Sequence, residues 1–216
     1  MKRTAILFDM DGLMVDTEPL ARRSWEYVVA AHDAVVSDDL YGRMVGLRTS
    51  ESARLLHAEL ALLLPVEELI ARKTAAFLVA LEEGVPVMPG LWALLDRVEA
   101  LGLRWAVATS TPRELAESVL GKLGLVGRYG ALAAGDEVAH GKPAPDLFLL
   151  AAERLGVAPA NCLALEDSGP GCAAAVAAGA RVIVVPTETT RHANFSGAYR
   201  RYPSLAEVAV DLEALL

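Results

Sequence analysis

The chain has 216 residues, of which 54% are apolar and 22% charged, and its formal net charge is −8. This size and composition are typical of a globular protein with one large core and a smaller insert or second domain. The acidic balance and the lack of a Lys/Arg-rich run argue against nucleic acid as a partner, and no uncharged apolar run approaches the roughly 20 residues that span a bilayer, so we predict no membrane association.

The first residues run directly into an apolar segment and lack the long apolar stretch and cleavage site of a signal peptide. We therefore predict a cytoplasmic protein. Its two cysteines, Cys162 and Cys172, lack a CxxC spacing. They are predicted to be buried, reduced thiols.

Residues 4–8 are predicted to form a strand that is buried on both faces, as in the centre of a parallel sheet. Two carboxylates, Asp9 and Asp11, follow this strand at once, and Gly12 comes next. Carboxylates at the end of a buried strand are costly unless something compensates them. A divalent cation would compensate them, which makes this pair the first candidate for a reacting site.

The segment from about 20 to 83 has the periodicity of helices and contains no convincing strand. Helices are predicted at 20–31, 50–63 and 65–82. Because this segment interrupts the pattern after the first strand, we interpret residues 17–86 as a helical cap domain inserted into a core made of residues 1–16 and 87–216.

After a Pro/Gly-rich cluster at 84–90, helices and strands alternate. Such alternation predicts an α/β fold with a doubly wound, Rossmann-like parallel sheet. The predicted helices are 91–101, 112–123, 145–155 and 171–178, and the predicted strands are 103–108, 130–134, 162–165 and 181–185.

Polar residues follow several of these strands. Thr109 and Ser110 follow one strand, Glu166 and Asp167 follow another, and Lys142 lies in a loop between a strand and a helix. Ligands of open α/β sheets bind beyond the carboxyl ends of the strands, so these side chains are expected to meet there. Oxygen ligands without His or Cys favour a hard cation such as Mg²⁺.

This set of residue types is suited to phosphoryl transfer. One carboxylate can attack phosphorus and form an aspartyl-phosphate, and a second can protonate the leaving oxygen and then activate water. Mg²⁺, Lys142 and the Thr109 hydroxyl would offset the charge of the phosphoryl group.

Four motifs carry a resemblance that extends over nearly the whole chain. The motifs are Asp9-Met10-Asp11-Gly12 with Asp16-Thr17-Glu18, Val107-Ala108-Thr109-Ser110, Gly141-Lys142-Pro143-Ala144-Pro145-Asp146 and Leu165-Glu166-Asp167-Ser168. In order and position they look like the motifs of the haloacid dehalogenase superfamily, and the layout is similar to the branch with phosphoglycolate phosphatases, sugar-phosphate phosphatases and β-phosphoglucomutases.

The resemblance implies a role for each position. Asp9 would be the nucleophile and a Mg²⁺ ligand, and Asp11 the general acid/base, binding Mg²⁺ through its backbone carbonyl. Thr109 and Ser110 would bind the phosphoryl group, and Lys142 would neutralise it and orient Asp9. Asp167, with Glu166 directly or through water, would complete the metal site. Dehalogenases of this superfamily carry only the first aspartate of the pair, so Asp11 indicates phosphoryl chemistry.

Further residues are candidates for contact with the substrate. Glu18, Gly46 and Arg48 are the candidates from the hinge and the cap, although a solvated face is the better explanation for Arg48 and its neighbour Arg43. Thr109 and Ser110 could instead cap the helix that follows them. The segment Ser168-Gly169-Pro170-Gly171 has the wrong spacing for a dinucleotide-binding turn.

The predicted function is a Mg²⁺-dependent phosphatase that hydrolyses a small phosphorylated metabolite, and the chain is expected to be a monomer. A phosphomutase of the β-phosphoglucomutase type is the alternative. Such mutases use a hinge His and a cap Arg, and the corresponding positions here are Ala21 and Thr49. A phosphate-binding module without activity is a third possibility, but binding alone would not require Asp11.

Overall fold

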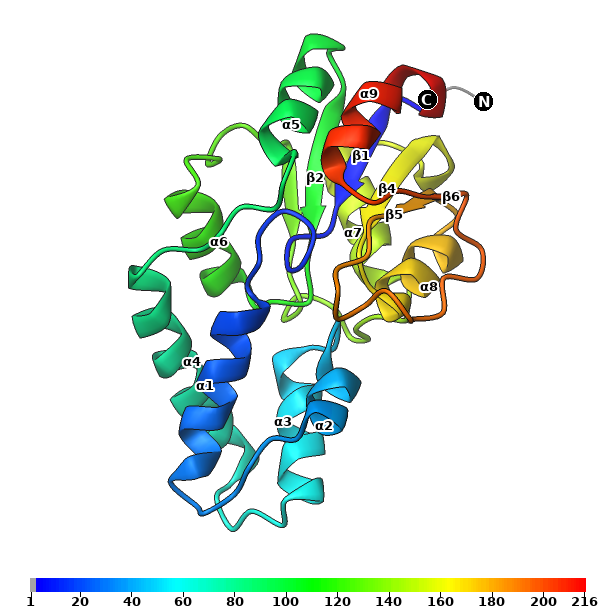
Figure 1. Cartoon of the computed structure of the whole chain (residues 1–216). Coiled ribbons are helices and arrows are strands. Elements are labelled where there is room, and N and C mark those ends of the chain that lie inside the picture. The colour runs from blue at the N-terminus through cyan, green and yellow to red at the C-terminus, as the bar shows by residue number, and fades with distance from the viewer. Residues whose placement is uncertain (1–2) are drawn as a thin grey trace.

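The computed structural model describes residues 3–216 (Figure 1). Its centre is a parallel sheet of six strands in the order β3-β2-β1-β4-β5-β6. This arrangement confirms the predicted α/β, Rossmann-like fold. The strands are β1 (Ala5–Phe8), β2 (Arg104–Ala108), β3 (Ala131–Ala133), β4 (Cys162–Glu166), β5 (Arg181–Val184) and β6 (Arg200–Arg201).

The register of the central strands places the first site residues together. Phe8, the last residue of β1, pairs with Val107 of β2 on one side and with Leu165 of β4 on the other. Parallel strands in register end at the same edge. The residues that come next, Asp9 and Glu166 among them, therefore meet at one rim.

Helices cover both faces of the sheet. They are α5 (Leu91–Ala100), α6 (Arg113–Lys122), α7 (Asp146–Leu155), α8 (Gly169–Ala177) and α9 (Leu205–Leu215). Successive side chains of a strand point to opposite faces. In β1, Ile6 and Phe8 pack into a cluster with residues of α5, α6 and α9, whereas Ala5 and Leu7 pack with residues of α7 and α8.

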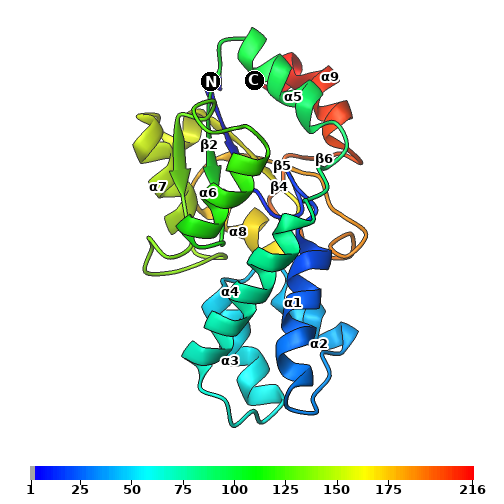
Figure 2. The same ribbon diagram turned by 90° about the vertical axis from the view of Figure 1, so that its left-hand side faces the viewer.

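Residues 18–82 form four helices, which we call the helical block. They are α1 (Glu18–Ala30), α2 (Asp38–Met44), α3 (Thr49–Glu59) and α4 (Val66–Glu82). The block has a hydrophobic cluster of its own, including Trp25, Leu56 and Leu69. It lies beyond the carboxyl ends of the strands, as Figures 1 and 2 show from two sides.

Several elements differ from the prediction. Helix α3 ends at Glu59, four residues early, because Ala61 adopts a φ of 47° and the amide of Leu62 turns back to the His57 carbonyl. The short helix α2, the edge strand β6 and the final helix α9 were not predicted. Helix α9 nevertheless has a clear sequence signal, since its buried residues Leu205, Val208, Leu212 and Leu215 recur every three or four positions.

Other expectations can be compared with the described residues. Cys162 and Cys172 are buried and free, as predicted. Among residues 3–216, none of the helices has the length and hydropathy that crossing a membrane requires. The predicted core starts at residue 1, and the prediction that the chain lacks a signal peptide also rests on its first residues. Of these, Met1 and Lys2 lie outside the described residues. The boundaries of the proposed domains stay a prediction.

Candidate active site

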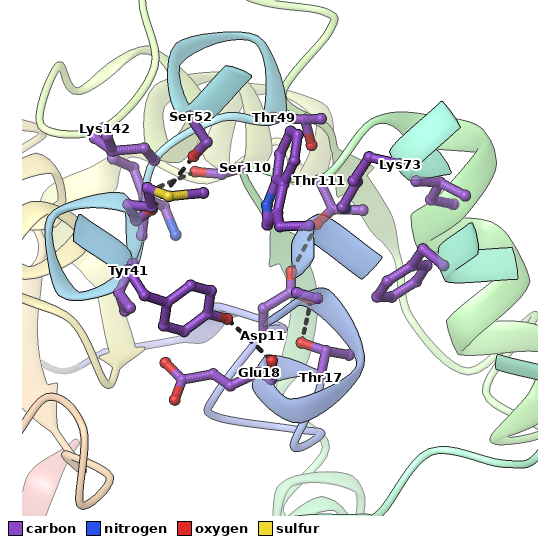
Figure 3. Close-up of a pocket in the computed structure, with 18 of the residues that line it drawn as sticks. Asp11, Thr17, Glu18, Tyr41, Thr49, Ser52, Lys73, Ser110, Thr111 and Lys142 are labelled. Atoms are coloured by element: carbon purple, nitrogen blue, oxygen red, sulfur yellow. Dashed lines mark hydrogen bonds between the residues drawn. The ribbon is translucent and has the colours of Figure 1, made fainter. Parts of the chain in front are cut away.

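A cavity of about 110 Å³ lies between the rim of the sheet and the helical block. From the core, its lining includes Asp9, Asp11, Ser110, Lys142 and Asp167. Residues of the helical block line the rest, among them Tyr41, Thr49 and Lys73 (Figure 3). With Glu18 and Gly46, which also line it, seven of the sequence-predicted site residues therefore share one cavity. Thr109 and Glu166 are buried directly behind it, each bonded to a residue that lines it.

Lys142 joins two of the predicted carboxylates. Its Nζ donates to Asp9 Oδ1 at 2.5 Å and to Glu166 Oε1 at 2.6 Å, and all three side chains are buried. Burial alone would lower the pKa of Lys142, but the two carboxylates raise it above its ordinary value. The ammonium therefore stays charged and fixes the Asp9 side chain at the end of β1.

The turn after β4 is shaped around Glu166. The second carboxylate oxygen of Glu166 accepts bonds from the backbone amides of Asp167 and Ser168 and from the Ser168 hydroxyl, each at 3.0 Å. A Cβ at Gly171 would lie 1.8 Å from Glu166 Oε1, so only glycine fits there. Ser168 thus caps α8, and Gly171 leaves room for the Glu166 side chain. These two roles explain the Ser and Gly residues of the segment 168–171 without a bound dinucleotide.

Asp167 is buried, with 2% of its surface exposed, and has few partners. Among the described residues, its carboxylate accepts one hydrogen bond, a long one of 3.5 Å from Thr190 Oγ1. Asp167 lies close to Gly12, in the loop after β1. Gly12 has a φ of 83°, and a Cβ there would lie 2.5 Å from Asp167 Oδ2, so glycine is needed at this position. Burial raises the pKa of Asp167 well above its ordinary value, and Glu166 and Asp9 add to the rise.

These carboxylates fit a divalent cation. Asp9, Glu166 and Asp167 each offer an oxygen within 4.8 Å of the others, and Lys142 supplies a single positive charge to the group. Burial raises the pKa of Asp9 to about 8, with Glu166 and Asp11 adding to the rise and Lys142 opposing it. A cation would lower the pKa of Asp9 and of Asp167, and oxygen ligands suit Mg²⁺.

Asp11 is held by three hydroxyl groups. Thr17 Oγ1 donates to Asp11 Oδ1 at 2.6 Å, and Thr111 Oγ1 donates to Oδ2 at 2.9 Å (Figure 3). Thr109 Oγ1 also donates to Oδ2 at 2.9 Å. Thr17 directly precedes α1, so the residue that leads into the helical block contacts the candidate acid/base. Thr111 was not predicted as a site residue, although it adjoins the predicted Thr109-Ser110 pair.

The predicted contacts from the hinge and the helical block have different surroundings. Glu18 and Gly46 line the cavity, and the Ser110 hydroxyl donates to the Gly46 carbonyl at 3.2 Å, which links the rim to the block. Burial raises the pKa of Glu18, a rise that a hydrogen bond with Thr189 opposes.

Arg48 does not line the cavity. Its guanidinium pairs with Glu51 at 2.7 Å and donates to the carbonyl oxygens of Val138 and Ala139 at 3.2 and 3.3 Å. These carbonyls belong to the loop that leads to Lys142, so Arg48 bridges the helical block and the core. Its predicted contact with substrate stays a prediction. Arg43 lies on the surface and pairs with Glu59 at 2.8 Å.

Sequence reasoning missed Lys73 of α4. This lysine is 6% exposed and lines the cavity from the helical block (Figure 3). Its Nζ lies 4.6 Å from the centre of the Phe77 ring and 5.6 Å from that of Trp25. The sequence does hold a signal: the buried residues of α4 recur every four positions as Leu69, Lys73, Phe77 and Leu81, which places a lysine within an apolar stripe.

The comparison with known families agrees with this site. A family model described as haloacid dehalogenase-like hydrolase matches residues 4–179. The chain therefore belongs to the haloacid dehalogenase-like hydrolases, as its four motifs predict.

Similar proteins narrow the class. Protein CbbY from Rhodobacter capsulatus is 37% identical over 223 residues, which cover 98% of this chain and 97% of that protein. Fructose-1-phosphate phosphatase YqaB from Escherichia coli (strain K12) is 37% identical over 179 residues, 81% of this chain and 92% of its own. A mutant of CbbY from Rhodobacter sphaeroides, in complex with xylulose-(1,5)bisphosphate, superposes with a TM-score of 0.89 at 34% identity, covering 95% and 96% of the two chains. The chain is a phosphoric monoester hydrolase.

Proposed function

We propose that this enzyme is a Mg²⁺-dependent phosphatase that hydrolyses a small sugar phosphate or a similar metabolite through an aspartyl-phosphate. The observation that carries the proposal is the buried contact of Lys142 with both Asp9 and Glu166, beside the poorly partnered Asp167. In this proposal Asp9, Glu166, Asp167 and the backbone carbonyl of Asp11 hold Mg²⁺. The ion would stabilise negative charge on the phosphoryl oxygens.

The reaction has two steps. A carboxylate oxygen of Asp9 attacks phosphorus, the bond to the leaving oxygen breaks, and the Asp11 carboxylic acid gives that oxygen its proton. The Asp11 carboxylate then takes a proton from water, whose oxygen attacks the same phosphorus while the bond to Asp9 breaks. Lys142 orients the Asp9 carboxylate. The hydroxyl groups of Thr109 and Thr111 hold the Asp11 carboxylate in place through hydrogen bonds.

Two positions favour a phosphatase over a mutase. Ala21 and Thr49, which stand where β-phosphoglucomutases have a His and an Arg, both line the cavity. Neither can supply an imidazole or a guanidinium, and the neighbouring Arg48 contacts the core loop instead.

The relatives support a sugar phosphate as substrate. YqaB is named for fructose 1-phosphate, and the CbbY mutant was crystallised with a sugar bisphosphate. The cytoplasmic location and the monomer stay predictions.

A phosphate-release assay over a panel of monoesters tests this proposal. We expect turnover with Mg²⁺, none in excess chelator, and a rise in Tm when Mg²⁺ is added, because the ion binds the folded state. Asp9→Asn is expected to remove turnover by about 10³-fold or more while the protein stays folded. Turnover of this variant at the wild-type rate would contradict the role of Asp9 as nucleophile. Full activity in excess chelator would contradict the requirement for Mg²⁺.

A further inference from the structure

Asp167 is the candidate metal ligand to which the protein gives the fewest hydrogen bonds. Asp9 bonds to Lys142, and Glu166 bonds to Lys142 and to three groups of its own turn. The buried Asp167 carboxylate accepts one bond within residues 3–216, from Thr190 Oγ1 at 3.5 Å. Because a carboxylate can turn about its terminal torsion, this contact bears on which oxygen Asp167 offers to a cation.

Thr190 can fix this carboxylate because Thr187 fixes the position of Thr190. Thr190 is 5% exposed and lies in the chain segment that follows β5. Its Oγ1 accepts a hydrogen bond from the Thr187 amide at 2.9 Å, and the Thr190 amide donates to Thr187 Oγ1 at 3.3 Å. These reciprocal bonds close a turn that holds the Thr190 hydroxyl beside Asp167.

The hydroxyl protons of the two threonines have one favourable arrangement. Thr190 Oγ1 has a single proton, which it can donate to Thr187 Oγ1 at 3.2 Å or to Asp167 Oδ2 at 3.5 Å. An ionised carboxylate is the stronger acceptor of the two. Thr190 therefore donates to Asp167 and Thr187 donates to Thr190, so that a chain of hydrogen bonds ends on the carboxylate.

The contact distinguishes the two oxygens of Asp167. Thr190 donates to Oδ2, which is also the oxygen nearer to Gly12. A Cβ at Gly12 would lie 2.5 Å from Oδ2 and 3.2 Å from Oδ1. Oδ2 is thus held by the protein, whereas Oδ1 accepts no hydrogen bond from the part of the chain that the structure describes.

We propose that Thr190 is a positioning residue, whose hydroxyl holds Oδ2 of Asp167 and leaves Oδ1 alone for the metal ion. This role rests on the proposed function, in which Asp167 binds Mg²⁺. Loss of a group that bonds to a metal ligand lowers metal affinity by about 10–100-fold. The role also bears on the choice of ion, because Ca²⁺ readily takes both oxygens of one carboxylate, whereas Mg²⁺ demands a near-ideal octahedron.

Calorimetric titration of the metal-free protein with Mg²⁺ and with Ca²⁺ tests this role without relying on turnover. We expect Thr190→Val to raise the Kd for Mg²⁺ by about tenfold or more. The Kd for Ca²⁺ should rise less, because Asp167 could then offer both oxygens. In the phosphate-release assay, the Mg²⁺ concentration that gives half the maximal rate should rise more than kcat at saturating Mg²⁺ falls. Thr190→Ser keeps the hydroxyl and should restore the affinity for Mg²⁺.

Thr4→Val is the matched control. It makes the same change at an exposed threonine that precedes β1, at the opposite end of this strand from Asp9, so the Kd for both ions should be unchanged. If Thr190→Val does not fold, Thr190→Ala provides the same comparison.

Two kinds of result would overturn the proposal, and they can be told apart. Unchanged Mg²⁺ affinity in Thr190→Val, or an equal loss of affinity for both ions, would overturn the positioning role while leaving the phosphatase intact. A wild-type protein that binds no Mg²⁺ would overturn the metal requirement of the proposed function, and the role of Thr190 with it.

Discussion

Charged side chains on the two sides of the cavity differ in the partners that the protein gives them. On the core side, Lys142 bonds to Asp9 and Glu166, and Asp11 accepts bonds from three hydroxyl groups. On the side of the helical block, Lys73 contacts two aromatic rings and has no polar partner among the described residues. A satisfied charge needs no ligand, whereas an unsatisfied buried charge marks a place where a ligand completes the structure. The core wall (the core side) thus leaves Asp167 with one long hydrogen bond, and the block wall (the side of the helical block) leaves Lys73 with aromatic contacts.

The largest effect is expected from removing the Lys142 ammonium, which bonds to both Asp9 and Glu166. We expect Lys142→Met to lower kcat by about 10²–10³-fold, because the phosphoryl charge loses a fixed donor. We also expect the free energy of unfolding in chelator to fall by about 3–5 kcal/mol, because Asp9 and Glu166 would remain buried without their partner. Phosphate release and urea unfolding measure the two effects.

Lys122→Met is a suitable control for this variant. Lys122 pairs with Glu82 at 3.1 Å on the surface, where an ion pair contributes little. Unchanged unfolding of Lys142→Met would show that the buried pair does not stabilise the core wall.

The opposite change in stability is expected at the block wall. Burial lowers the pKa of Lys73 from 10.5 to about 8, so folding with the charged lysine costs roughly 3 kcal/mol at pH 7. Lys73→Met should remove this cost and raise Tm at pH 7 by a few degrees, less the loss of the aromatic contacts. Thermal unfolding followed by circular dichroism measures the shift.

The pH dependence gives a second, signed readout. Between about pH 8 and 10.5 the unfolded chain binds a proton at Lys73 that the folded chain does not. Wild-type stability should therefore rise with pH through this window relative to Lys73→Met, and the cost should be gone above it. A Lys73→Met variant that is less stable than wild type at pH 7 would mean that the lysine holds the block together.

The core wall was predictable from sequence because the sheet leaves it little freedom. Once three strands are read as parallel and buried, their carboxyl ends must meet. Asp9 and Thr109 directly follow such an end, and Glu166 is the last residue of β4. Lys142 lies outside any strand, and its place was found through its motif.

The block wall was less predictable for a physical reason. Helical periodicity tells which face of a helix is buried but not whether that face meets another helix or a cavity. On α4, one stripe of residues serves both purposes: Leu69 packs within the block, and Lys73 and Phe77 face the cavity. The direction of Arg48 was equally hidden, since its acceptors, the carbonyls of Val138 and Ala139, are about 90 residues away in the chain.

A variant of Arg48 tests the contact between the two walls, because Arg48 belongs to the helical block and donates hydrogen bonds to the core. Its two bonds to carbonyl oxygens hold the block against the loop that carries Lys142. If these bonds stabilise the contact between the block and this loop by about 1.4 kcal/mol, Arg48→Ala should lower kcat/KM about tenfold.

The pattern across substrates decides what this loss means. A residue that holds the block closed affects every ester equally, whereas a residue that binds the leaving group, as the sequence predicts for Arg48, affects some esters more than others. Steady-state rates on fructose 1-phosphate and 2-phosphoglycolate make the distinction, and Arg43→Ala, at a surface arginine paired with Glu59, is the control. A tenfold loss on one ester and none on the other would place Arg48 with the substrate and remove it from the contact between the two walls. An equal loss on both would assign recognition of the leaving group to the block's other residues.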